Sequence, residues 1–202
     1  MENIVLESGL IIIAYLCGSL PTGFILSRVF GNIDIRKYGS HNIGATNVYR
    51  NLGKKIGALT LLGDVIKGFL PVYLVYFVTG AEIWVSLAAV ATFLGHLHPV
   101  YLKFSGGKGV ATALGVFLVL SPQLIVISGI IFFLTLFLFR YVSLSSISAA
   151  ATIPLLMYLA PFSYPHSYII TSIIIAIMIG YRHKENIKRI IKGTESKIGG
   201  GG

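Results

Sequence analysis

Acidic residues and cysteines are scarce in this chain, and each scarcity excludes a class of protein. Only seven of the 202 residues are Asp or Glu, and charged residues make up 11% of the chain. Soluble domains usually carry ~25% charged residues, so the composition excludes a soluble globular domain. The single cysteine, Cys17, rules out an internal disulfide. The few carboxylates are thin support for Mg²⁺, and we expect neither a metal nor a cofactor.

Three familiar catalytic patterns are missing as well. None of the five histidines is followed by Asp five residues later, as the acyltransferase signature His-x-x-x-x-Asp requires. No serine has the flanking glycines of a G-x-S-x-G nucleophile elbow, the usual signal for a covalent acyl-enzyme. A nucleotide P-loop would need Gly at position 102 and Ser or Thr at 109, where the chain has Leu102 and Gly109. The sequence therefore excludes a P-loop ATPase.

Hydrophobic residues, at 55%, are what the chain has in abundance. Its apolar runs approach the ~20 residues that a spanning helix needs, and they are too many for the first to be merely a signal peptide. We predict an all-α, polytopic integral membrane helical bundle, with residues 1–198 as one transmembrane domain and 199–202 as a flexible tail. About seven spanning helices are expected, near residues 4–29, 56–79, 83–102, 108–120, 123–139, 147–160 and 167–181.

The 16 Lys and Arg residues fall mostly on one side of this predicted topology. Fifteen of them lie in or border the loops after the first, third and fifth predicted helices and the C-terminal tail, and the sixteenth is Lys67 inside the second helix. The opposite loops carry no Lys or Arg. The positive-inside rule then places the N-terminus outside and the C-terminus in the cytoplasm. Topology and anionic lipid account for much of the net charge of +9, and nucleic-acid binding is not expected.

The first basic segment, residues 35–50, has the composition of an anion-binding loop. Glycines allow the backbone to turn with its N–H groups exposed, and hydroxyls, amides and a guanidinium supply further donors. Such donors surround a tetrahedral anion, and a guanidinium matches two of its oxygens. Taken alone, the segment is also consistent with a turn that caps the next helix. The donor residues are Gly39, Gly44, Ser40, Thr46, Asn42, Asn47 and Arg50.

Three further segments add polar groups on the same predicted side. Residues 105–112 form a second glycine-rich turn that opens a helix around Lys108, and helix N-termini attract anions. Each segment alone is also typical of a solvated helix end. Together, the four segments would place polar groups at one membrane face. The added candidates are Gly106, Gly107, Lys108 and Gly109 in the second segment, Ser143 and Ser146 in the third, and His183 and Asn186 in the tail. His183 and Asn186 are three residues apart, so on a helix they share a face.

Two buried polar groups remain to be explained inside the predicted helices. Asp64 and Lys67 lie three residues apart, where an unpaired charge would cost several kcal/mol. A mutual ion pair facing the bundle is the simplest account, and an ion or proton pathway is the alternative. His96 and His98 are expected to pack or form hydrogen bonds near the end of the third helix.

The four segments resemble the motifs of the bacterial PlsY family of acyl-phosphate:glycerol-3-phosphate acyltransferases. The resemblance rests on residues 39–47, 106–112, 141–143 and 182–186, and it spans nearly the whole chain. It implies transfer of a fatty acyl group from acyl phosphate to glycerol 3-phosphate in the cytoplasmic membrane, with membrane lipid as a further partner. The implied products are lysophosphatidic acid and inorganic phosphate.

The resemblance also implies roles for the candidate residues. Phosphate contacts go to Ser40, Arg50 and Lys108, and a polar pocket is completed by Ser146, His183 and Asn186. Gly39, Ser143 and the backbone of the second turn assist, and Asn42, Thr46 and Asn47 either bind substrate or shape the loop. The competing hypothesis is a small phosphate or anion transporter, which is disfavoured because the outer loops lack cations and no inverted repeat is evident.

Overall fold

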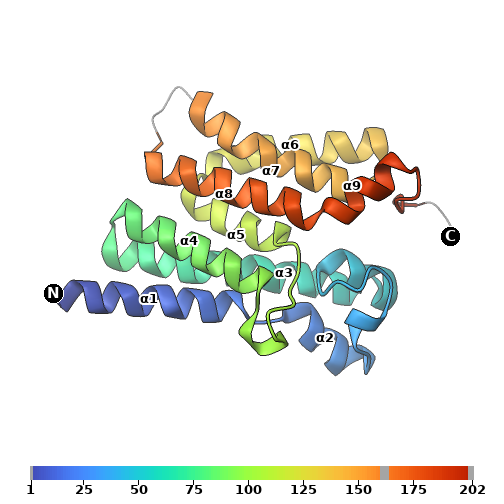
Figure 1. Cartoon of the computed structure of the whole chain (residues 1–202), viewed down its shortest axis with the longest axis horizontal. Helices are drawn as coiled ribbons and strands as arrows, with labels where there is room; N and C mark the ends of the chain where they lie inside the picture. The colour runs from blue at the N-terminus through green and yellow to red at the C-terminus, as the bar shows by residue number, and fades with distance from the viewer. Residues whose placement is uncertain (1, 160–163, 200–202) are drawn as a thin grey trace. The chain divides into compact units, whose positions relative to one another are not determined.

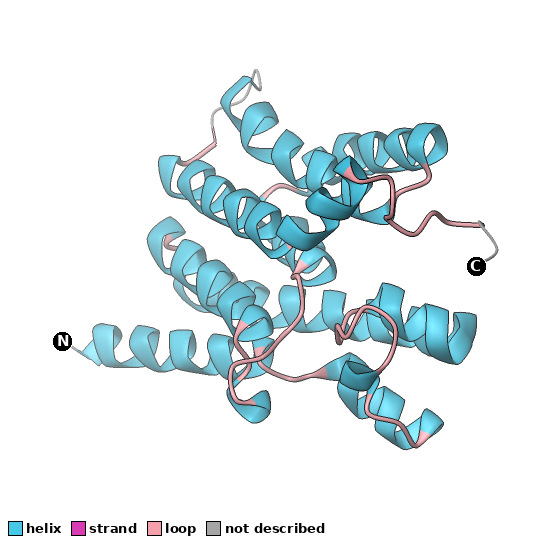
Figure 2. Ribbon diagram, turned by 45° about the vertical axis from the view of Figure 1, so that its right-hand side comes forward, coloured by secondary structure: helices cyan, strands magenta, loops and turns pink. Residues whose placement is uncertain are grey.

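Proline and glycine divide the apolar runs of the chain into helices (Figure 1). The computed structural model describes residues 2–159 and 164–199, and all regular structure in this part of the chain is helical (Figure 2). The predicted all-α class is therefore confirmed. Residue 160 of the sixth predicted span, residues 161–163 after it and 200–202 of the predicted tail lie outside the described residues.

The chain forms two compact units, Met1–Val119 and Leu120–Gly202. The first contains, in order, α1 (Glu2–Gly18), α2 (Thr22–Gly31), the 3-10 helix η1 (Ile35–Lys37), α3 (Ala45–Thr79), α4 (Glu82–Leu97), the 3-10 helix η2 (Val100–Leu102) and α5 (Val110–Leu120), which ends at the boundary. The second contains α6 (Pro122–Phe139), α7 (Val142–Leu159), α8 (His166–Arg182) and α9 (Lys184–Ile191).

Three predicted spans in the first unit differ from the observed helices. The run predicted over 83–102 is divided into α4, which ends at Leu97, and η2, because Pro99 stands between them. The run predicted as one helix over 4–29 is divided into α1 and α2, because Pro21, which has no N–H to donate, stands immediately before α2. The helix predicted over 56–79 begins at Ala45 and is interrupted at Gly53, whose φ of +85° and ψ of 177° are not helical. The polar turns at its start carry no apolar run that would reveal them.

Glycines allow two pairs of helices in the first unit to approach closely. A Cβ at Gly18 would collide with the carbonyl oxygen of Thr92, so α1 and α4 meet backbone to backbone. A Cβ at Gly68 would collide with the carbonyl oxygen of Thr112, which brings α3 and α5 together in the same way. Small residues at helix crossings are typical of membrane bundles, because close backbones maximise van der Waals contact in lipid.

In the second unit, α7 packs against both α6 and α8. The hydroxyl of Ser128 in α6 donates to the carbonyl oxygen of Ala149 in α7 at 2.9 Å. Helix α7 begins at Val142, earlier than the predicted start at 147, so Ser143 and Ser146 belong to its first turns and not to a loop. Hydroxyl groups at the start of a helix hide it from a search for apolar runs.

The membrane character of the fold is visible in its helix lengths. The described residues contain five helical stretches long and apolar enough to cross a membrane: Ile4–Gly31, Ala45–Thr79, Glu82–Leu102, Pro122–Phe139 and Val142–Leu159. Two shorter apolar helices, Val110–Leu120 and His166–Arg182, correspond to the remaining predicted spans. Large side chains such as Phe77 and Phe137 are 77% and 83% exposed, as lipid-facing residues are.

Candidate active site

The buried side chain of Asn47 organises the first predicted loop. Its Nδ2 donates to the carbonyl oxygens of Tyr38 at 3.0 Å and Asn42 at 2.8 Å. Its Oδ1 accepts a hydrogen bond from the backbone N–H of Ser40 at 3.0 Å. Because the amide is committed to the loop's own backbone, Asn47 shapes the loop, which is one of the two roles that the sequence left open.

Asn42 and Gly39 support the same loop conformation. Oδ1 of Asn42 accepts from the N–H of Gly44 at 2.8 Å, and Gly44 is the N-cap of α3. This Asx-type bond fixes the entry of the chain into the helix. Gly39 has a φ of +56°, and a Cβ there would collide with Oδ1 of Asn47. Both residues therefore hold the backbone that presents Ser40.

Two predicted phosphate ligands, Ser40 and Arg50, lie on the exposed side of this loop with Thr46, which was predicted either to bind substrate or to shape the loop. Ser40 is exposed at the turn, and Thr46 and Arg50 are exposed on the first turns of α3. Thr46 and Arg50 are four residues apart, so they share a helix face. The positive end of the helix macrodipole favours anions at this position. The loop can thus offer hydroxyls and a guanidinium to a phosphate from one direction.

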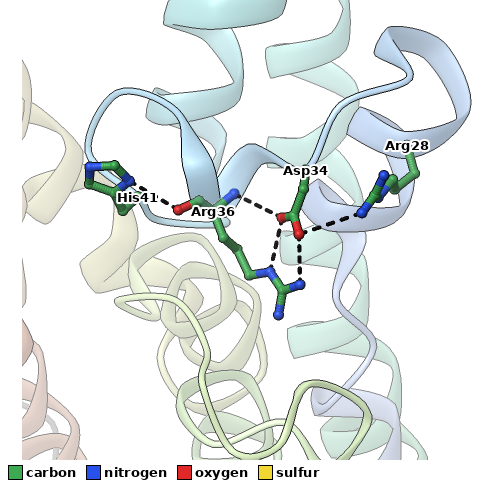
Figure 3. Close-up of polar contacts among 4 residues, drawn as sticks. All are labelled: Arg28, Asp34, Arg36 and His41. Carbon is green, nitrogen blue, oxygen red and sulfur yellow. Dashed lines mark hydrogen bonds and ion pairs between the residues drawn. The ribbon is translucent and has the colours of Figure 1, made fainter.

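A carboxylate holds the beginning of the loop (Figure 3). Asp34 accepts hydrogen bonds from Nε and Nη2 of Arg36 at 2.9 and 2.8 Å, and Nη2 of Arg28 lies 3.5 Å from its Oδ2. Both guanidiniums also lie over the ring of Phe24. Nδ1 of His41 lies 3.0 Å from the carbonyl oxygen of Arg36. The hydrogen bonds from Arg36 outweigh burial and lower the pKa of Asp34 to about 2.

Replacing Asp34 with Asn is expected to destabilise the protein at neutral pH and to have little effect in acid. The folded pKa of about 2 lies below the ordinary value of 3.8, so the ionised carboxylate stabilises the fold above that value and ceases to do so as the pH falls toward 2. Since the Arg36 side chain is 38% exposed and screened by solvent, the expected loss at neutral pH is about 1 kcal/mol.

Thermal midpoints of wild type and Asp34→Asn, measured in detergent from neutral to strongly acidic pH, check this prediction. The gap between the two proteins should close as the solution becomes acidic. A gap of constant size would show that Asp34 acts through something other than its charge.

The second predicted segment forms a tight turn between η2 and α5. The N–H of Gly107 donates to the carbonyl oxygen of His96 at 3.2 Å, and a Cβ at Gly106 would collide with that same oxygen. Gly109 has a φ of +84°, which a larger residue would rarely adopt. Lys108 is half-buried between these glycines, immediately before α5. The turn therefore lies against the end of α4 and presents a cation at a helix N-terminus.

One buried apolar cluster joins the first loop to the segment before the second turn. Ile35 and Ile43 from the loop, Val48 from α3 and Leu102 from η2 are buried in it. Leu102 lies six residues before Lys108 in the chain. Within the first unit, packing thus places the loop that carries Ser40 and Arg50 beside the segment that leads to Lys108.

In the second unit, the carboxylate of Glu195 joins the starts of α7 and α9. Its side chain is 7% exposed and accepts hydrogen bonds from Oγ of Ser143 at 2.7 Å, Nδ2 of Asn186 at 2.6 Å and Nε of Arg189 at 2.7 Å. Burial raises the pKa of Glu195, but these three hydrogen bonds outweigh it, and the pKa is lowered overall. Two separately predicted site residues, Ser143 and Asn186, are therefore brought together around a carboxylate that the sequence did not single out.

Replacing Glu195 with Ala is expected to loosen the tail, because the buried donors of Ser143 and Asn186 would lose their acceptor at a cost of about 1–3 kcal/mol in the free energy of unfolding. Trypsin should then cleave after Lys192 and Lys197 several-fold faster than in wild type. The matched control is Glu185→Ala, since Glu185 is exposed and pairs with Lys188 at 3.0 Å. Equal cleavage rates in the two variants would contradict the bridging role of Glu195.

Two more predicted residues are buried in the second unit. His183 lies between α8 and α9, and its Nδ1 is 2.8 Å from the carbonyl oxygen of Ile179. A carbonyl oxygen can only accept, so Nδ1 carries the hydrogen and the neutral ring has its lone pair at Nε2. The hydroxyl of Ser146 donates to the carbonyl oxygen of Val142 at 2.8 Å. Ser146 therefore retains its acceptor lone pairs.

The structure adds residues to the candidate list. The sequence did not single out Glu195 and Arg189, because Ser143 lies 52 residues from Glu195 and no local spacing marks the contacts within the tail. Asp64 and Lys67 form the predicted ion pair, with 2.8 Å between Oδ1 and Nζ. Within residues 2–159 and 164–199, no three His, Cys, Asp or Glu side chains gather in a way that could hold a metal ion.

Comparison with known proteins identifies relatives over almost the whole chain. The family model described as glycerol-3-phosphate acyltransferase matches residues 8–193. A glycerol-3-phosphate acyltransferase of Geotalea daltonii is 51% identical over 94% of this chain and 96% of its own length. One from Syntrophotalea carbinolica is 48% identical over the same shares.

Solved structures show the same fold. The crystal structure of PlsY, an integral membrane glycerol 3-phosphate acyltransferase, in its glycerol 3-phosphate form has a TM-score of 0.91 and 40% identity, covering 96% of both chains. Its lysophosphatidic acid form has a TM-score of 0.89 and 39% identity, covering 96% of this chain and 95% of that one. The predicted multi-pass membrane fold is confirmed by this likeness.

Proposed function

Because this chain belongs to the glycerol-3-phosphate acyltransferase family, we propose that it transfers a fatty acyl group from acyl phosphate to the sn-1 hydroxyl of glycerol 3-phosphate. The protein is an integral membrane acyltransferase, and glycerol 3-phosphate is its acceptor substrate. Acyl phosphate as the acyl donor, and the residues that bind the two substrates, are proposals. Lysophosphatidic acid and inorganic phosphate are the products.

The observation that carries the proposal is the packing of two phosphate-binding elements in the first unit. The apolar cluster that contains Ile43 and Leu102 sets the loop of Ser40 and Arg50 beside the segment that leads to Lys108. Hydroxyl, guanidinium and ammonium groups together suit two phosphates better than one. Ser40, Arg50 and Lys108 are therefore assigned to the substrate phosphates, with the backbone of the glycine turn assisting.

An acyl phosphate needs no nucleophile from the protein. It is a mixed anhydride, so the hydroxyl oxygen of glycerol 3-phosphate attacks the acyl carbonyl carbon directly, and the bond from that carbon to the phosphate oxygen breaks. The electron pair of this bond leaves with the phosphate. The attacking hydroxyl loses its proton to a base. Positioning of the two substrates and fixed positive charge supply the rate, in keeping with the missing nucleophile elbow.

Positive charge is required because two phosphates must lie close together. At ~6 Å, two unit negative charges repel by ~3 kcal/mol at an effective dielectric of ~20. Arg50 and Lys108 offset this repulsion, and the N-termini of α3 and α5 add partial positive charge. The arrangement favours the transition state, in which charge moves onto the departing phosphate.

Polar residues of the second unit are proposed to contact substrate as well. Ser143, Ser146, His183 and Asn186 belong to the starts of α7 and α9. Residues 1–198 are proposed to act as a single transmembrane acyltransferase domain. The tail after residue 198 takes no part.

The base that accepts the hydroxyl proton is proposed to be an oxygen of the substrate phosphate. His183 is the alternative, since with its hydrogen on Nδ1 a neutral imidazole has a lone pair at Nε2. His183→Gln is therefore expected to keep measurable turnover with the pH–rate profile of wild type, assayed beside it. Loss of all turnover with substrate binding intact would assign the proton to His183.

The protein is proposed to lie in the bacterial cytoplasmic membrane with its site facing the cytoplasm. Fifteen of its 16 Lys and Arg residues belong to the segments assigned to that side by the positive-inside rule. The acyl chain would stay in hydrocarbon while both phosphates stay in water. Membrane lipid is then both the surroundings of the enzyme and the destination of its product.

The proposal is tested by incubating the purified protein with palmitoyl phosphate and radiolabelled glycerol 3-phosphate, without ATP, acyl-CoA or added metal. Equal amounts of lysophosphatidic acid and inorganic phosphate are expected. Absence of product, together with phosphate uptake by proteoliposomes that contain the protein, would favour the transporter instead. Product formed only when acyl-CoA is added would overturn the choice of donor.

A further inference from the structure

Three ionisable side chains are buried beneath the glycine turn of the first unit. Asp64 and Lys67 of α3 and His96 of α4 have side chains 3%, 5% and 3% exposed. None of them belongs to the proposed mechanism. Nζ of Lys67 lies 2.8 Å from Oδ1 of Asp64 and donates to the carbonyl oxygen of Leu20, in the break between α1 and α2, at 2.6 Å. The pair therefore ties α3 to that break.

The ring of His96 lies between this ion pair and the turn. Its Nδ1 is 3.8 Å from Oδ1 of Asp64. On its other edge, a Cβ at Gly107 would collide with Nε2. The backbone of His96 contacts the turn as well, because its carbonyl oxygen accepts from the N–H of Gly107 at 3.2 Å. His96 thus meets the turn with both its side chain and its main chain.

We infer that His96 is a positioning residue for the phosphate-binding turn 106–109, and that the Asp64–Lys67 pair fixes its ring. This inference rests on the proposed function, because it concerns how Lys108 and the turn's N–H groups are held for phosphate. A turn made of glycines has little stiffness of its own. The ring of His96 packs directly beneath the turn and limits its movement, and the buried carboxylate of Asp64 sets the orientation of the ring.

The ion pair also explains why the buried carboxylate beside the ring of His96 is stable. Lys67 neutralises Asp64 inside an apolar bundle, where one charge alone would be costly. The carboxylate can then face the imidazole without drawing in water. A displacement of the turn by about 1 Å would be enough to lower kcat/KM for glycerol 3-phosphate substantially, since acyl transfer depends on the alignment of two substrates.

The inference predicts a compensating pair of substitutions. Gly107→Ala alone should lower kcat/KM for glycerol 3-phosphate by ~10²-fold, because its Cβ would displace the turn from the ring. His96→Ala alone should raise the KM for glycerol 3-phosphate by ~10-fold with a smaller change in kcat, and His96→Gln should restore part of that loss. In the His96→Ala background, adding Gly107→Ala should cost less than ~10-fold, because the ring no longer opposes the Cβ.

The experiment measures KM and kcat with palmitoyl phosphate and glycerol 3-phosphate for wild type, the three single variants and the double variant, with thermal midpoints as the folding control. His166→Ala, at the exposed start of α8, is the control variant and should behave as wild type. Should His96→Ala not fold, the same comparison is made with Gly107→Ala in wild type and in His96→Gln, where the added cost should again be smaller.

Two failures can be told apart in this experiment. An active wild type in which Gly107→Ala costs the same with and without the ring of His96 would overturn the positioning role alone. A loss in kcat with no change in the KM for glycerol 3-phosphate in His96→Ala would overturn the positioning role as well. A wild type that makes no lysophosphatidic acid from palmitoyl phosphate would overturn the proposed function, and the inference with it.

Discussion

Lys108→Ala is expected to lower kcat/KM by ~10²–10³-fold while the helical bundle stays folded. Lys108 is the cation of the glycine turn, half-buried immediately before α5. In the proposed reaction it offsets the repulsion between two phosphates and the charge that develops on the departing one. A fixed charge in such a position acts mainly on the transition state, so kcat should fall along with kcat/KM.

The measurement is steady-state turnover with palmitoyl phosphate and glycerol 3-phosphate, each varied in turn. Lys188→Ala is the matched control, because Lys188 is a 64% exposed lysine of α9 that pairs with Glu185. That variant should keep near-normal turnover. If Lys108→Ala were as active as Lys188→Ala at both low and high substrate concentration, the assignment of the second turn would be wrong.

Arg50→Ala is expected to lower kcat/KM by ~10²-fold or more, and Arg50→Lys should recover little of the loss. A guanidinium offers two parallel donors to a phosphate, whereas an ammonium is a single point of charge. Arg50 is exposed on the face of α3 that also carries Thr46, beside the turn of Ser40. The same assay checks this prediction, with binding of glycerol 3-phosphate measured separately by calorimetry.

Lys54→Ala is the control for Arg50, since Lys54 is an exposed cation four residues further along α3, beyond the break at Gly53. It should show near-normal kcat/KM. Full rescue by Arg50→Lys would mean that charge alone is needed at position 50. The proposed two-oxygen contact would then be wrong.

The course of the helices was largely predictable, and their beginnings were not. Apolar runs long enough to span a membrane mark α6 and α8 within one or two residues, because lipid requires apolar side chains all round. The starts of α3 and α7 are polar, with Thr46 and Ser143 in their first turns, so no apolar pattern reveals them. Pro21 separates two helices inside a continuing apolar run. Gly53 breaks α3 before its apolar run has begun.

The candidate site was predictable to the extent that residue type alone decides it. The ion pair of Asp64 and Lys67 followed from the cost of burying one charge, and the structure confirms it. Asn47 has the donors to bind a phosphate or to hold a loop, and only its three-dimensional contacts show that it holds the loop. Glu195 was not singled out because its contact with Ser143 joins residues 52 apart in the chain, and its contacts with Asn186 and Arg189 follow no recognised spacing.

The substrate phosphates are proposed to be held by the loop of Ser40 and the turn of Lys108, both in the first unit. The most direct test is a pair of distances between spin labels in proteoliposomes, with Cys17 replaced by Ser and cysteines introduced at exposed positions. Leu102 and Ile35 share one apolar cluster, whereas α4 places Glu82 about 22 Å from Leu97 at a rise of 1.5 Å per residue. Labels at Lys103 and Lys37 are therefore expected to lie much closer together than labels at Lys103 and Glu82. A Lys103 label nearer to Glu82 than to Lys37 would contradict a phosphate site shared by the loop and the turn.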